Sequence, residues 1–288
     1  MTAKNTFFQE KKTLNIHGRI MDLSVPKVMG ILNLTPDSFF DGGRHNELRA
    51  ALERTEQMLQ EGADIIDVGA YSSRPNAADI SQEEELARLL PVLNEIRKAF
   101  PEAVLSVDTF RAEVARVAVS EGVHIINDIS AGQLDPKMFK TAAALKVPYI
   151  LMHMKGTPQT MQQHAHYDNV LNEVVDYFIK KVRELTDLGV VDIILDPGFG
   201  FSKTVAHNYE LLNHLDTLKM LGLPILAGVS RKTMIWKTLG ITPDEALNGT
   251  TVLNTVALMK GARILRVHDV KAAAEAVKLV SQLNPNSL

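Results

Sequence analysis

The sequence predicts an α/β fold, a closed barrel of eight strands that are each followed by a helix. Eight short, continuous apolar runs rich in β-branched residues alternate with amphipathic helical patterns, as is typical of parallel strands covered on both faces. A doubly wound sheet has fewer strands, about five to seven. The 288 residues suit one (β/α)8 or TIM barrel, which commonly occupies about 250 residues. We therefore expect a single domain over residues 1–288.

The N-terminal segment is expected to differ from the barrel. Residues 1–13 are expected to be a flexible extension. From Leu14 to Leu23 the sequence alternates around Gly18, a residue type that readily adopts a positive φ, and this pattern predicts a β-hairpin within residues 14–27. We expect the hairpin to cover the N-terminal mouth of the barrel, which spans residues 28–288. This role is structural.

The barrel elements follow in strict alternation. The predicted strands are the short apolar runs at residues 28–33, 64–69, 104–108, 124–128, 148–153, 192–197, 223–229 and 263–268. The predicted helices carry apolar residues at spacings of about three or four. They lie at residues 48–59, 81–99, 111–121, 136–145, 169–188, 209–218, 233–239, 246–260 and 270–283.

The composition argues against several classes of protein. The 31 Lys and Arg residues nearly balance the 34 Asp and Glu residues, so no overall charge attracts nucleic acid or an anionic membrane. The absence of cysteine excludes disulfides and thiolate metal sites. No signal peptide is recognisable, and no run reaches the roughly 18 apolar residues of a membrane span. We expect a cytoplasmic protein that binds neither nucleic acid nor membrane.

Nearly every predicted strand ends on a polar, chemically capable side chain. The active sites of such barrels lie at the C-terminal ends of the strands, so we expect these side chains to meet at one mouth. They are Asn33, Asp67, Asp108, Asn127, His153, Asp196, Arg231 with Lys232, and Arg266 with His268. Of these, His153 is interpreted as a structural histidine.

An acceptor-rich group is formed by Asp108, Asn127 and Asp196. Both carboxylates follow apolar stretches, LSVD and IILD, so each would lie at the rim of the core, where an unpaired charge is costly. Ionised carboxylates only accept hydrogen bonds, so this group suits a ligand rich in N–H donors. The alternative is that each carboxylate caps the next helix. That alternative is weaker for Asp196, which precedes Pro197 and Gly198.

A cationic group lies near the end of the chain. Barrels often bind phosphate with the loops after strands seven and eight, and these positions hold the blocks Ser-Arg-Lys, at 230–232, and Arg-Val-His, at 266–268. Because Arg266 and His268 are two apart on a strand, they point to the same side and can share one anionic ligand with Arg231 and Lys232. The alternative is that these are solvated basic residues.

Two long polar loops follow strands one and two, at residues 34–43 and 70–76. Phe39 and Phe40 in the first loop favour closure over a ligand, and the alternative is that they pack against a neighbouring helix.

The pair His164 and His166 is interpreted as part of a solvated loop. The lone Trp236 is interpreted as a packing residue of a helix.

Several sequence blocks resemble the dihydropteroate synthase family of pterin-binding barrel enzymes, in the same order and over roughly residues 28–270. The blocks are MGILNLTPDSFFDGG, DVGAYSSRP, SVDT, INDI, LMHMKGTPQTMQ, LDPGFGFSK, GVSRK and RVHDV. The resemblance implies that the amine of p-aminobenzoate attacks the methylene of 7,8-dihydropterin pyrophosphate and expels pyrophosphate. It also implies Mg2+ as cofactor, small-molecule substrates as partners, and a homodimer formed through outer helices late in the barrel.

The same resemblance implies roles for individual residues. The catalytic residues would be Asp108, Lys232 and Asp67. The pterin ring would be bound by Asp108, Asn127, Asp196 and Lys232. Pyrophosphate would be held by Asn33, Arg74, Arg266 and His268, and Asn33 would also help to bind Mg2+. The p-aminobenzoate pocket would be shaped by Phe39, Ser73, Pro75, Phe201, Lys203 and Ser230.

The apparent separation of carboxylates from cations favours a route in which pyrophosphate leaves first and Asp108 stabilises the resulting cation. The second loop departs from the family pattern, because Tyr71, Ser73 and Asn76 replace the Glu, Thr and Gly of the common block GESTRPGA. One alternative is a methyltetrahydrofolate-dependent methyltransferase, which would not need these loops. The other is a pterin-binding paralogue without catalysis, and the intact site residues argue against it.

Overall fold

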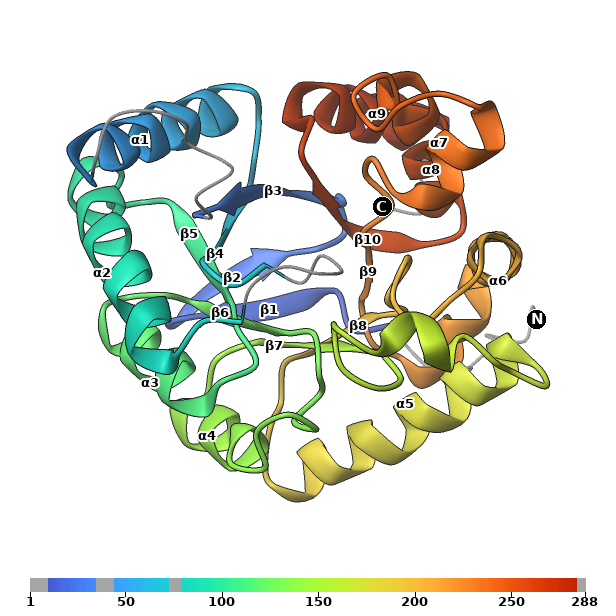
Figure 1. Cartoon of the computed structure of the whole chain (residues 1–288), viewed down its shortest axis with the longest axis horizontal. Coiled ribbons are helices and arrows are strands. Elements are labelled where there is room, and N and C mark those ends of the chain that lie inside the picture. Colours follow the sequence, from blue (N-terminus) through green and yellow to red (C-terminus); the bar gives the residue numbers. More distant parts are fainter. Residues whose placement is uncertain (1–9, 35–43, 73–78, 284–288) are drawn as a thin grey trace, which may run out of the picture.

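The computed structural model describes residues 10–34, 44–72 and 79–283, and within them it shows a closed barrel of eight parallel strands surrounded by helices (Figure 1). The order around the barrel is β10-β3-β4-β5-β6-β7-β8-β9. The strands are β3 (Lys27–Asn33), β4 (Ile65–Gly69), β5 (Val104–Asp108), β6 (Ile125–Asp128), β7 (Tyr149–Met152), β8 (Ile193–Asp196), β9 (Ile225–Ala227) and β10 (Ala262–Val267). The predicted (β/α)8 barrel is confirmed.

The helices of the outer ring agree closely with those predicted, with one exception. They are α1 (Arg44–Gln60), α2 (Gln82–Ala99), α3 (Ala112–Ser120), α4 (Met138–Leu145), α5 (Val170–Asp187), α6 (Val205–Asn213), α7 (Thr233–Leu239), α8 (Leu247–Met259) and α9 (Val270–Leu283), with 3-10 helices η2 (Met161–His164) and η3 (Leu215–Leu221). The helix predicted at 209–218 is divided into α6 and η3. Thr204 and His207 form a capping box that starts α6 earlier, and His214 leaves the helical conformation and ends it.

The predicted N-terminal hairpin is formed by β1 (Thr13–Ile16) and β2 (Arg19–Asp22), which pair antiparallel. The turn places His17 and Gly18 at φ values of 48° and 87°, the two positive values that a tight hairpin turn needs. The ordered chain begins earlier than expected. Lys11 forms an ion pair with Asp192 at 2.6 Å, so this part of the expected extension is tied to the barrel. Residues 1–9 lie outside the described residues.

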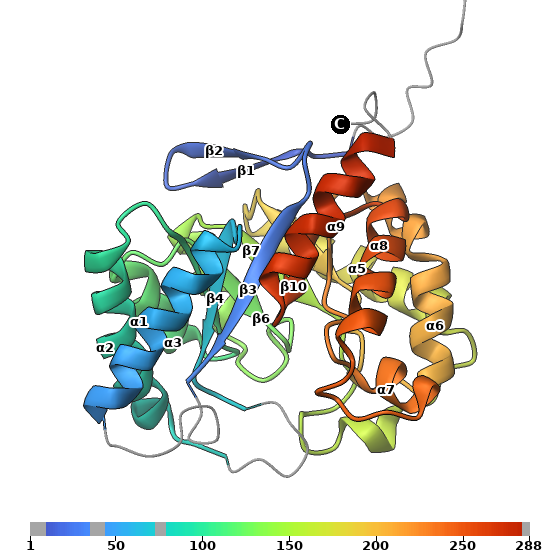
Figure 2. The same cartoon turned by 90° about the horizontal axis from the view of Figure 1, so that it is seen from above.

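The hairpin lies across the end of the barrel at which the strands begin (Figure 2). Its apolar side chains Leu14, Ile16 and Leu23 pack with the first inward-facing residues of the strands, including Met29 and Ile65. This packing removes the apolar floor of the barrel from water. The opposite end, where the strands finish, is therefore the one available for chemistry.

The strands β4, β6, β7 and β8 are buried along their whole length, because the larger apolar core lies between the barrel and its helices. This burial explains why these strands read as continuous apolar runs rather than as alternating ones. Among the helices of the described ranges, none combines the length and the apolar character of a membrane span.

Candidate active site

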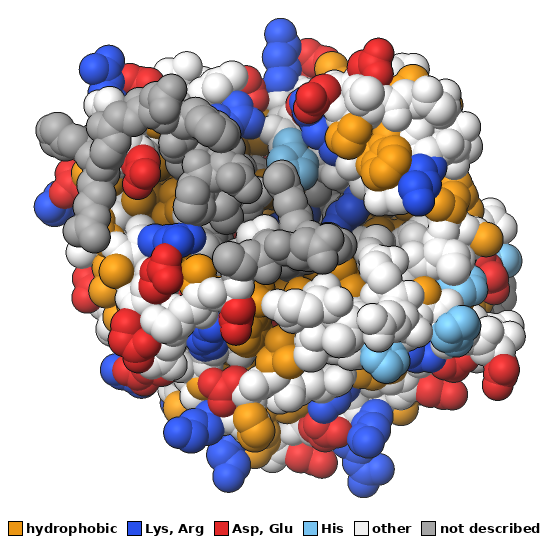
Figure 3. Space-filling model, in the orientation of Figure 1, with side chains coloured by type: hydrophobic (Ala, Val, Ile, Leu, Met, Phe, Trp, Pro, Cys, Tyr) orange, Lys and Arg blue, Asp and Glu red, His pale blue; other side chains and the backbone are white. Residues whose placement is uncertain are grey.

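A cavity of about 680 Å3 opens at the C-terminal ends of the strands. Figure 3 shows this face of the molecule, with basic and histidine side chains near its centre. The cavity brings together most of the predicted site residues that lie in the described ranges. They are Asn33, Asp108, Asn127, Asp196, Phe201, Ser230, Lys232, Arg266 and His268. The residues Phe39, Ser73, Arg74 and Pro75 lie outside the described residues, as do Phe40 and Asn76.

Asp67 lies behind the cavity wall rather than on it. Its carboxylate is fully buried on β4, where Oδ2 accepts hydrogen bonds from Asn127 Nδ2 at 3.0 Å and from Arg266 Nε at 2.6 Å. Both donors line the cavity. The structure therefore gives Asp67, which the resemblance places among the catalytic residues, the role of orienting Asn127 and Arg266.

Asp108 ends β5 and faces the cavity. It does not cap the next helix, because α3 begins at Ala112, whose N–H donates instead to the Asp135 carboxylate at 2.7 Å. On the neighbouring strand Gly69 pairs with Asp108, and any side chain at Gly69 would meet Asp108 Cβ at 3.1 Å. Burial raises the pKa of Asp108 to about 7, against the opposing effect of Arg266.

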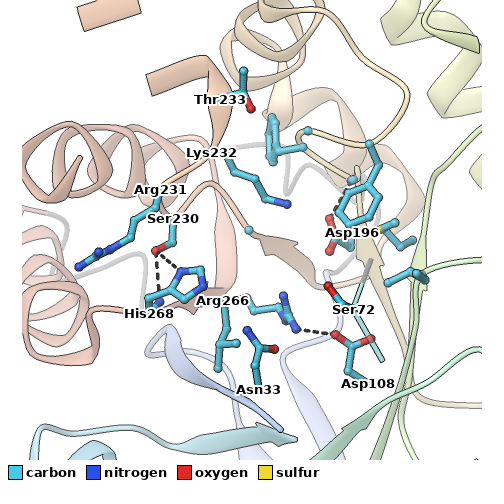
Figure 4. A pocket seen from close by; sticks show the side chains of 18 of the residues that line it. Asn33, Ser72, Asp108, Asp196, Ser230, Arg231, Lys232, Thr233, Arg266 and His268 are labelled. Carbon is cyan, nitrogen blue, oxygen red and sulfur yellow. Dashed lines mark hydrogen bonds and ion pairs between the residues drawn. The ribbon is translucent and has the colours of Figure 1, made fainter. Parts of the chain in front are cut away.

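Arg266 corrects the expectation that carboxylates and cations occupy separate parts of the mouth. Its Nη2 lies 2.6 Å from Asp108 Oδ2 (Figure 4), and its Nε binds Asp67. A guanidinium inside the barrel needs carboxylate partners because an unpaired buried charge is costly. The charges of the two groups thus neutralise one another in the site.

Asp196 ends β8 and closes a tight turn. Its Oδ1 accepts the N–H of Gly198 at 2.7 Å, and Gly198 adopts a φ of 68°. A side chain there would meet the carbonyl oxygen of His153 at 2.1 Å, so this position requires glycine. Burial raises the pKa of Asp196, and its carboxylate remains an acceptor at the cavity wall.

Lys232 extends into the cavity from the loop after β9 (Figure 4). Its Nζ lies 4.4 Å from the centre of the Phe201 ring, a cation–π contact. Burial, with a smaller contribution from Arg266, lowers the pKa of Lys232 to about 8. The ammonium is therefore close to its titration range at physiological pH.

Two members of the expected cationic group do not act as cations in the cavity. Arg231 lines the cavity, but its guanidinium points away from Lys232 and Arg266 (Figure 4) and pairs with Asp269 at 2.7 Å. Burial lowers the pKa of His268 to about 4, so the imidazole is neutral near pH 7. The Ser230 hydroxyl lies 3.1 Å from His268 Nδ1 and also accepts the His268 N–H. In the tautomer in which the hydroxyl donates to Nδ1, the ring proton lies on Nε2, where it can be donated to an anion.

Lys203 is also placed differently from the expectation. Its ammonium lies under the turn at 198–203, outside the set of described residues that line the cavity, and donates to the carbonyls of His153, Gly198 and Phe201 at 3.1 to 3.3 Å. It also lies 2.9 Å from His153 Nδ1. The carbonyls of Gly198 and Phe201 also accept from the Phe201 N–H and the Ser202 hydroxyl, so the buried Lys203 side chain gives each a second donor and supplies one to His153.

Some lining residues were not predicted from the sequence. Trp236, interpreted as a packing residue, packs on the core and also lines the cavity, as do Tyr71 and Met161. The position of Trp236, on the helix that follows the seventh barrel strand, was the available signal. His164 ends η2 at the surface, and the described residues hold no cluster of three or more His, Asp or Glu that could bind a metal ion on its own.

The comparison with known families agrees with this geometry. The model of the family described as "Pterin binding enzyme" matches residues 29–268, which span the barrel from β3 to the end of β10. The chain belongs to this family of pterin binding enzymes.

Individual relatives narrow the assignment. The dihydropteroate synthase of Escherichia coli K12 is 47% identical over 265 residues, which cover 91% of this chain and 93% of the relative. The crystal structure of the Yersinia pestis dihydropteroate synthase with a sulfonamide drug complex has a TM-score of 0.89 and 42% identity, and covers 95% of this chain and 99% of that one. The Xanthomonas albilineans dihydropteroate synthase with 4-aminobenzoic acid has a TM-score of 0.89, 40% identity, and coverages of 95% and 98%. Within its family the chain belongs with the dihydropteroate synthases.

Proposed function

We propose that this chain condenses 6-hydroxymethyl-7,8-dihydropterin diphosphate with p-aminobenzoate to give 7,8-dihydropteroate and pyrophosphate, a step of folate biosynthesis. The observation that carries the proposal is a single cavity in which Asp108, Asn127 and Asp196 present acceptors beside the cations Arg266 and Lys232. The relatives named dihydropteroate synthase support the same reaction. They do not favour the methyltransferase or the non-catalytic paralogue.

The acceptors suit the pterin ring. Its amino group and ring N–H groups are donors, and the carboxylates of Asp108 and Asp196 with the amide oxygen of Asn127 are matching acceptors. Asp67 receives the Asn127 amide group at 3.0 Å, so the oxygen of that amide is the end left for the ligand. Lys232 adds a donor for the ring's carbonyl or nitrogen acceptors.

The other end of the cavity suits the diphosphate. Arg266 supplies a guanidinium that binds phosphate oxygens in a fixed planar geometry, and His268 supplies a neutral N–H. To bind the diphosphate, Arg266 gives up part of its contact with Asp108, now 2.6 Å away. The hydrogen bond from Arg266 Nε to Asp67 is kept, so the guanidinium stays anchored.

The donor set near Asn33 fits Mg2+ only together with substrate. Asn33 offers one neutral amide oxygen, and Arg266, in the same part of the cavity (Figure 4), repels a free metal ion. Mg2+ is commonly held by few protein oxygens together with substrate phosphates and water. When bound, the ion would neutralise the charge that develops on the leaving pyrophosphate.

The residues then favour bond breaking before bond making. The C–O bond between the methylene and the diphosphate breaks, and its electron pair leaves with pyrophosphate towards Arg266. The cation is shared with the dihydropterin ring and faces the Asp108 carboxylate. The lone pair of the p-aminobenzoate amine forms the new C–N bond, and the amine releases one proton to pyrophosphate or water.

The direct test is incubation of the full chain with dihydropterin diphosphate and p-aminobenzoate, with and without Mg2+, while dihydropteroate and pyrophosphate are measured separately. We expect equal amounts of the two products, and only with Mg2+ present. Pyrophosphate without dihydropteroate would indicate hydrolysis instead. No product with any metal would favour the paralogue without catalysis.

We also propose that the chain forms a homodimer through α8 and α9. Four apolar side chains of these helices are more than half exposed, an unfavourable arrangement in water. They are Val252, Met259, Leu279 and Leu283. Light scattering should give twice the chain mass for the wild type and the monomer mass for Met259→Glu with Leu279→Glu, whereas Ile20→Glu, on the exposed hairpin face, should stay dimeric. The expected cytoplasmic location stays a prediction.

A further inference from the structure

One side chain contacts the described chain on both sides of residues 73–78. Arg111 Nη2 donates to the carbonyl oxygen of Ile80 at 2.6 Å, and the same nitrogen lies 3.7 Å from the Asp79 carboxylate. Before the segment, the guanidinium carbon of Arg111 lies 5.5 Å from the centre of the Tyr71 ring. The same carbon lies 4.9 Å from the centre of the ring of Phe110, its neighbour in the chain. Because Tyr71 precedes this segment and Ile80 follows it, Arg111 links its two ends.

Arg111 is itself firmly anchored. Its Nη1 forms an ion pair with Glu85, a fully buried residue in the first turn of α2. The second carboxylate oxygen of Glu85 has no hydrogen-bond partner within the described residues, so the buried charge depends on Arg111. A planar guanidinium can satisfy Glu85, a carbonyl and two aromatic faces at once, and an ammonium cannot.

Tyr71 connects Arg111 to the cavity, because it contacts the guanidinium and also lines the cavity. Its ring meets Phe110 edge to face with centres 4.9 Å apart, and its hydroxyl accepts a hydrogen bond from Gln159 Nε2 at 2.8 Å. Gln159 lies in the loop after β7, which continues to the apolar lining residue Met161. Phe110, on which Tyr71 packs, also packs against the apolar cluster that contains Met161. Tyr71 and Met161 are therefore parts of one apolar wall, joined through Phe110, and this wall suits an aromatic ring better than the donor-rich pterin.

We propose that Arg111 is a positioning residue that fixes the Tyr71 wall and both ends of segment 73–78, and thereby sets the affinity for the aromatic amine substrate. The inference rests on the proposed function, in which p-aminobenzoate is the second substrate. Arg111 acts through Tyr71 and Ile80. Of the residues proposed to bind pterin and diphosphate, Asp108 at the end of β5 is the nearest along the chain, and its ion pair is with Arg266 rather than with Arg111. The others lie on other strands and loops.

The test compares Arg111→Met and Arg111→Lys with Arg116→Met. This control lies on the exposed side of α3, the helix that Arg111 precedes, and its guanidinium pairs with Glu113 one turn away. We expect Arg111→Met to raise the KM for p-aminobenzoate about tenfold or more, because small displacements of a positioning group have large effects. The KM for the pterin diphosphate should stay within about twofold. The KM for p-aminobenzoate of Arg111→Lys should lie between those of the wild type and Arg111→Met. Arg116→Met should match the wild type in both KM values.

Loss of the Glu85 partner would destabilise Arg111→Met, so the double variant Arg111→Met with Glu85→Gln is included. In this variant, hydrogen exchange at residues 66–72 and 79–85 should be faster than in Arg116→Met. A folded double variant with an unchanged KM for p-aminobenzoate would overturn the inference, and so would equal rises in both KM values. If the wild type forms no dihydropteroate, the proposed function fails, and the assignment of p-aminobenzoate as substrate fails with it. Hydrogen exchange at residues 66–72 and 79–85 tests the positioning role of Arg111 separately, because it requires no turnover.

Discussion

Arg266 Nη2 lies 2.6 Å from Asp108 Oδ2, and this ion pair joins the part of the cavity that suits the pterin to the part that suits pyrophosphate. The same guanidinium lies 2.6 Å from Asp67. Asp108 therefore has a cationic partner before any substrate binds. A diphosphate that draws Arg266 towards itself leaves the Asp108 carboxylate as an acceptor for the pterin, so binding of the two ends of this substrate is coupled.

The Asp108→Asn variant tests whether this carboxylate stabilises the cation that forms when pyrophosphate leaves. Asparagine keeps the size and can still accept a hydrogen bond, but it has no charge. We expect kcat to fall by about 10² to 10³, the range seen when a group that stabilises transition-state charge is removed. Steady-state kinetics would measure this, with circular dichroism to establish folding. A folded variant with wild-type kcat would contradict the role.

Asp67 should matter more for stability than its distance from the substrate suggests. Asp67→Asn removes the buried charge that binds Arg266 from behind the cavity wall. Breaking a buried pair costs about 3–5 kcal/mol, so the free energy of unfolding, measured with urea, should fall by about that amount. The control is Asp216→Asn, whose ion pair with Lys260 is partly exposed and 3.7 Å long, and it should change stability by less than about 1 kcal/mol. Equal effects would show that Asp67 is not a supporting residue.

The pH dependence of kcat/KM should be bell-shaped. The mechanism requires Asp108 without its proton, and burial raises the pKa of Asp108 to about 7, so activity rises with pH through this range. It requires Lys232 with its proton, and burial lowers the pKa of Lys232 to about 8, so activity falls above that range. Lys232→Arg keeps the charge at high pH and should move the falling limb upwards. An unmoved falling limb would assign it to another group.

The fold was predictable because each barrel strand carries its own local signal. Strands β7 and β8 are buried on both faces and read as apolar runs, broken only by Asp196 at the end of β8. The N-terminal boundary was not predictable, since Lys11 is ordered by an ion pair with Asp192, about 180 residues away along the chain. The start of α6 was missed because the capping box of Thr204 and His207 precedes the apolar pattern.

The site was predictable as a set of residues but not as a set of partners. Strand ends identify which side chains reach the mouth, whereas pairing depends on directions that the sequence does not contain. Arg231 and Lys232 are adjacent, yet the positive φ of Arg231 turns its side chain towards Asp269. Arg266 was expected to meet only an anion and instead lies between two carboxylates. The family resemblance implied that Lys203 helps to shape the p-aminobenzoate pocket. Its ammonium instead binds the carbonyls of the turn at 198–203.

Lys203→Met distinguishes a structural role from a role in binding p-aminobenzoate. The structure predicts that the carbonyl of His153 loses its Lys203 donor, while those of Gly198 and Phe201 each lose one of two donors, at a cost of about 1–3 kcal/mol in the free energy of unfolding. Thermal and urea denaturation would measure the loss. A direct binding role predicts instead a higher KM for p-aminobenzoate at unchanged stability. The latter outcome would restore the assignment that the family resemblance implies.

The single tryptophan of the chain lines the cavity, so its fluorescence should report ligand binding without any turnover. We expect Mg2+ with inorganic pyrophosphate to change the emission of Trp236, and Mg2+ alone to have no effect, because Asn33 by itself is an incomplete ligand set. Pyrophosphate alone should bind at least about tenfold more weakly, since the metal neutralises part of its charge. Trp236→Phe gives the background signal, and Arg266→Met should remove the response while the tryptophan is retained. A response to Mg2+ alone would show that the metal site is complete before substrate arrives.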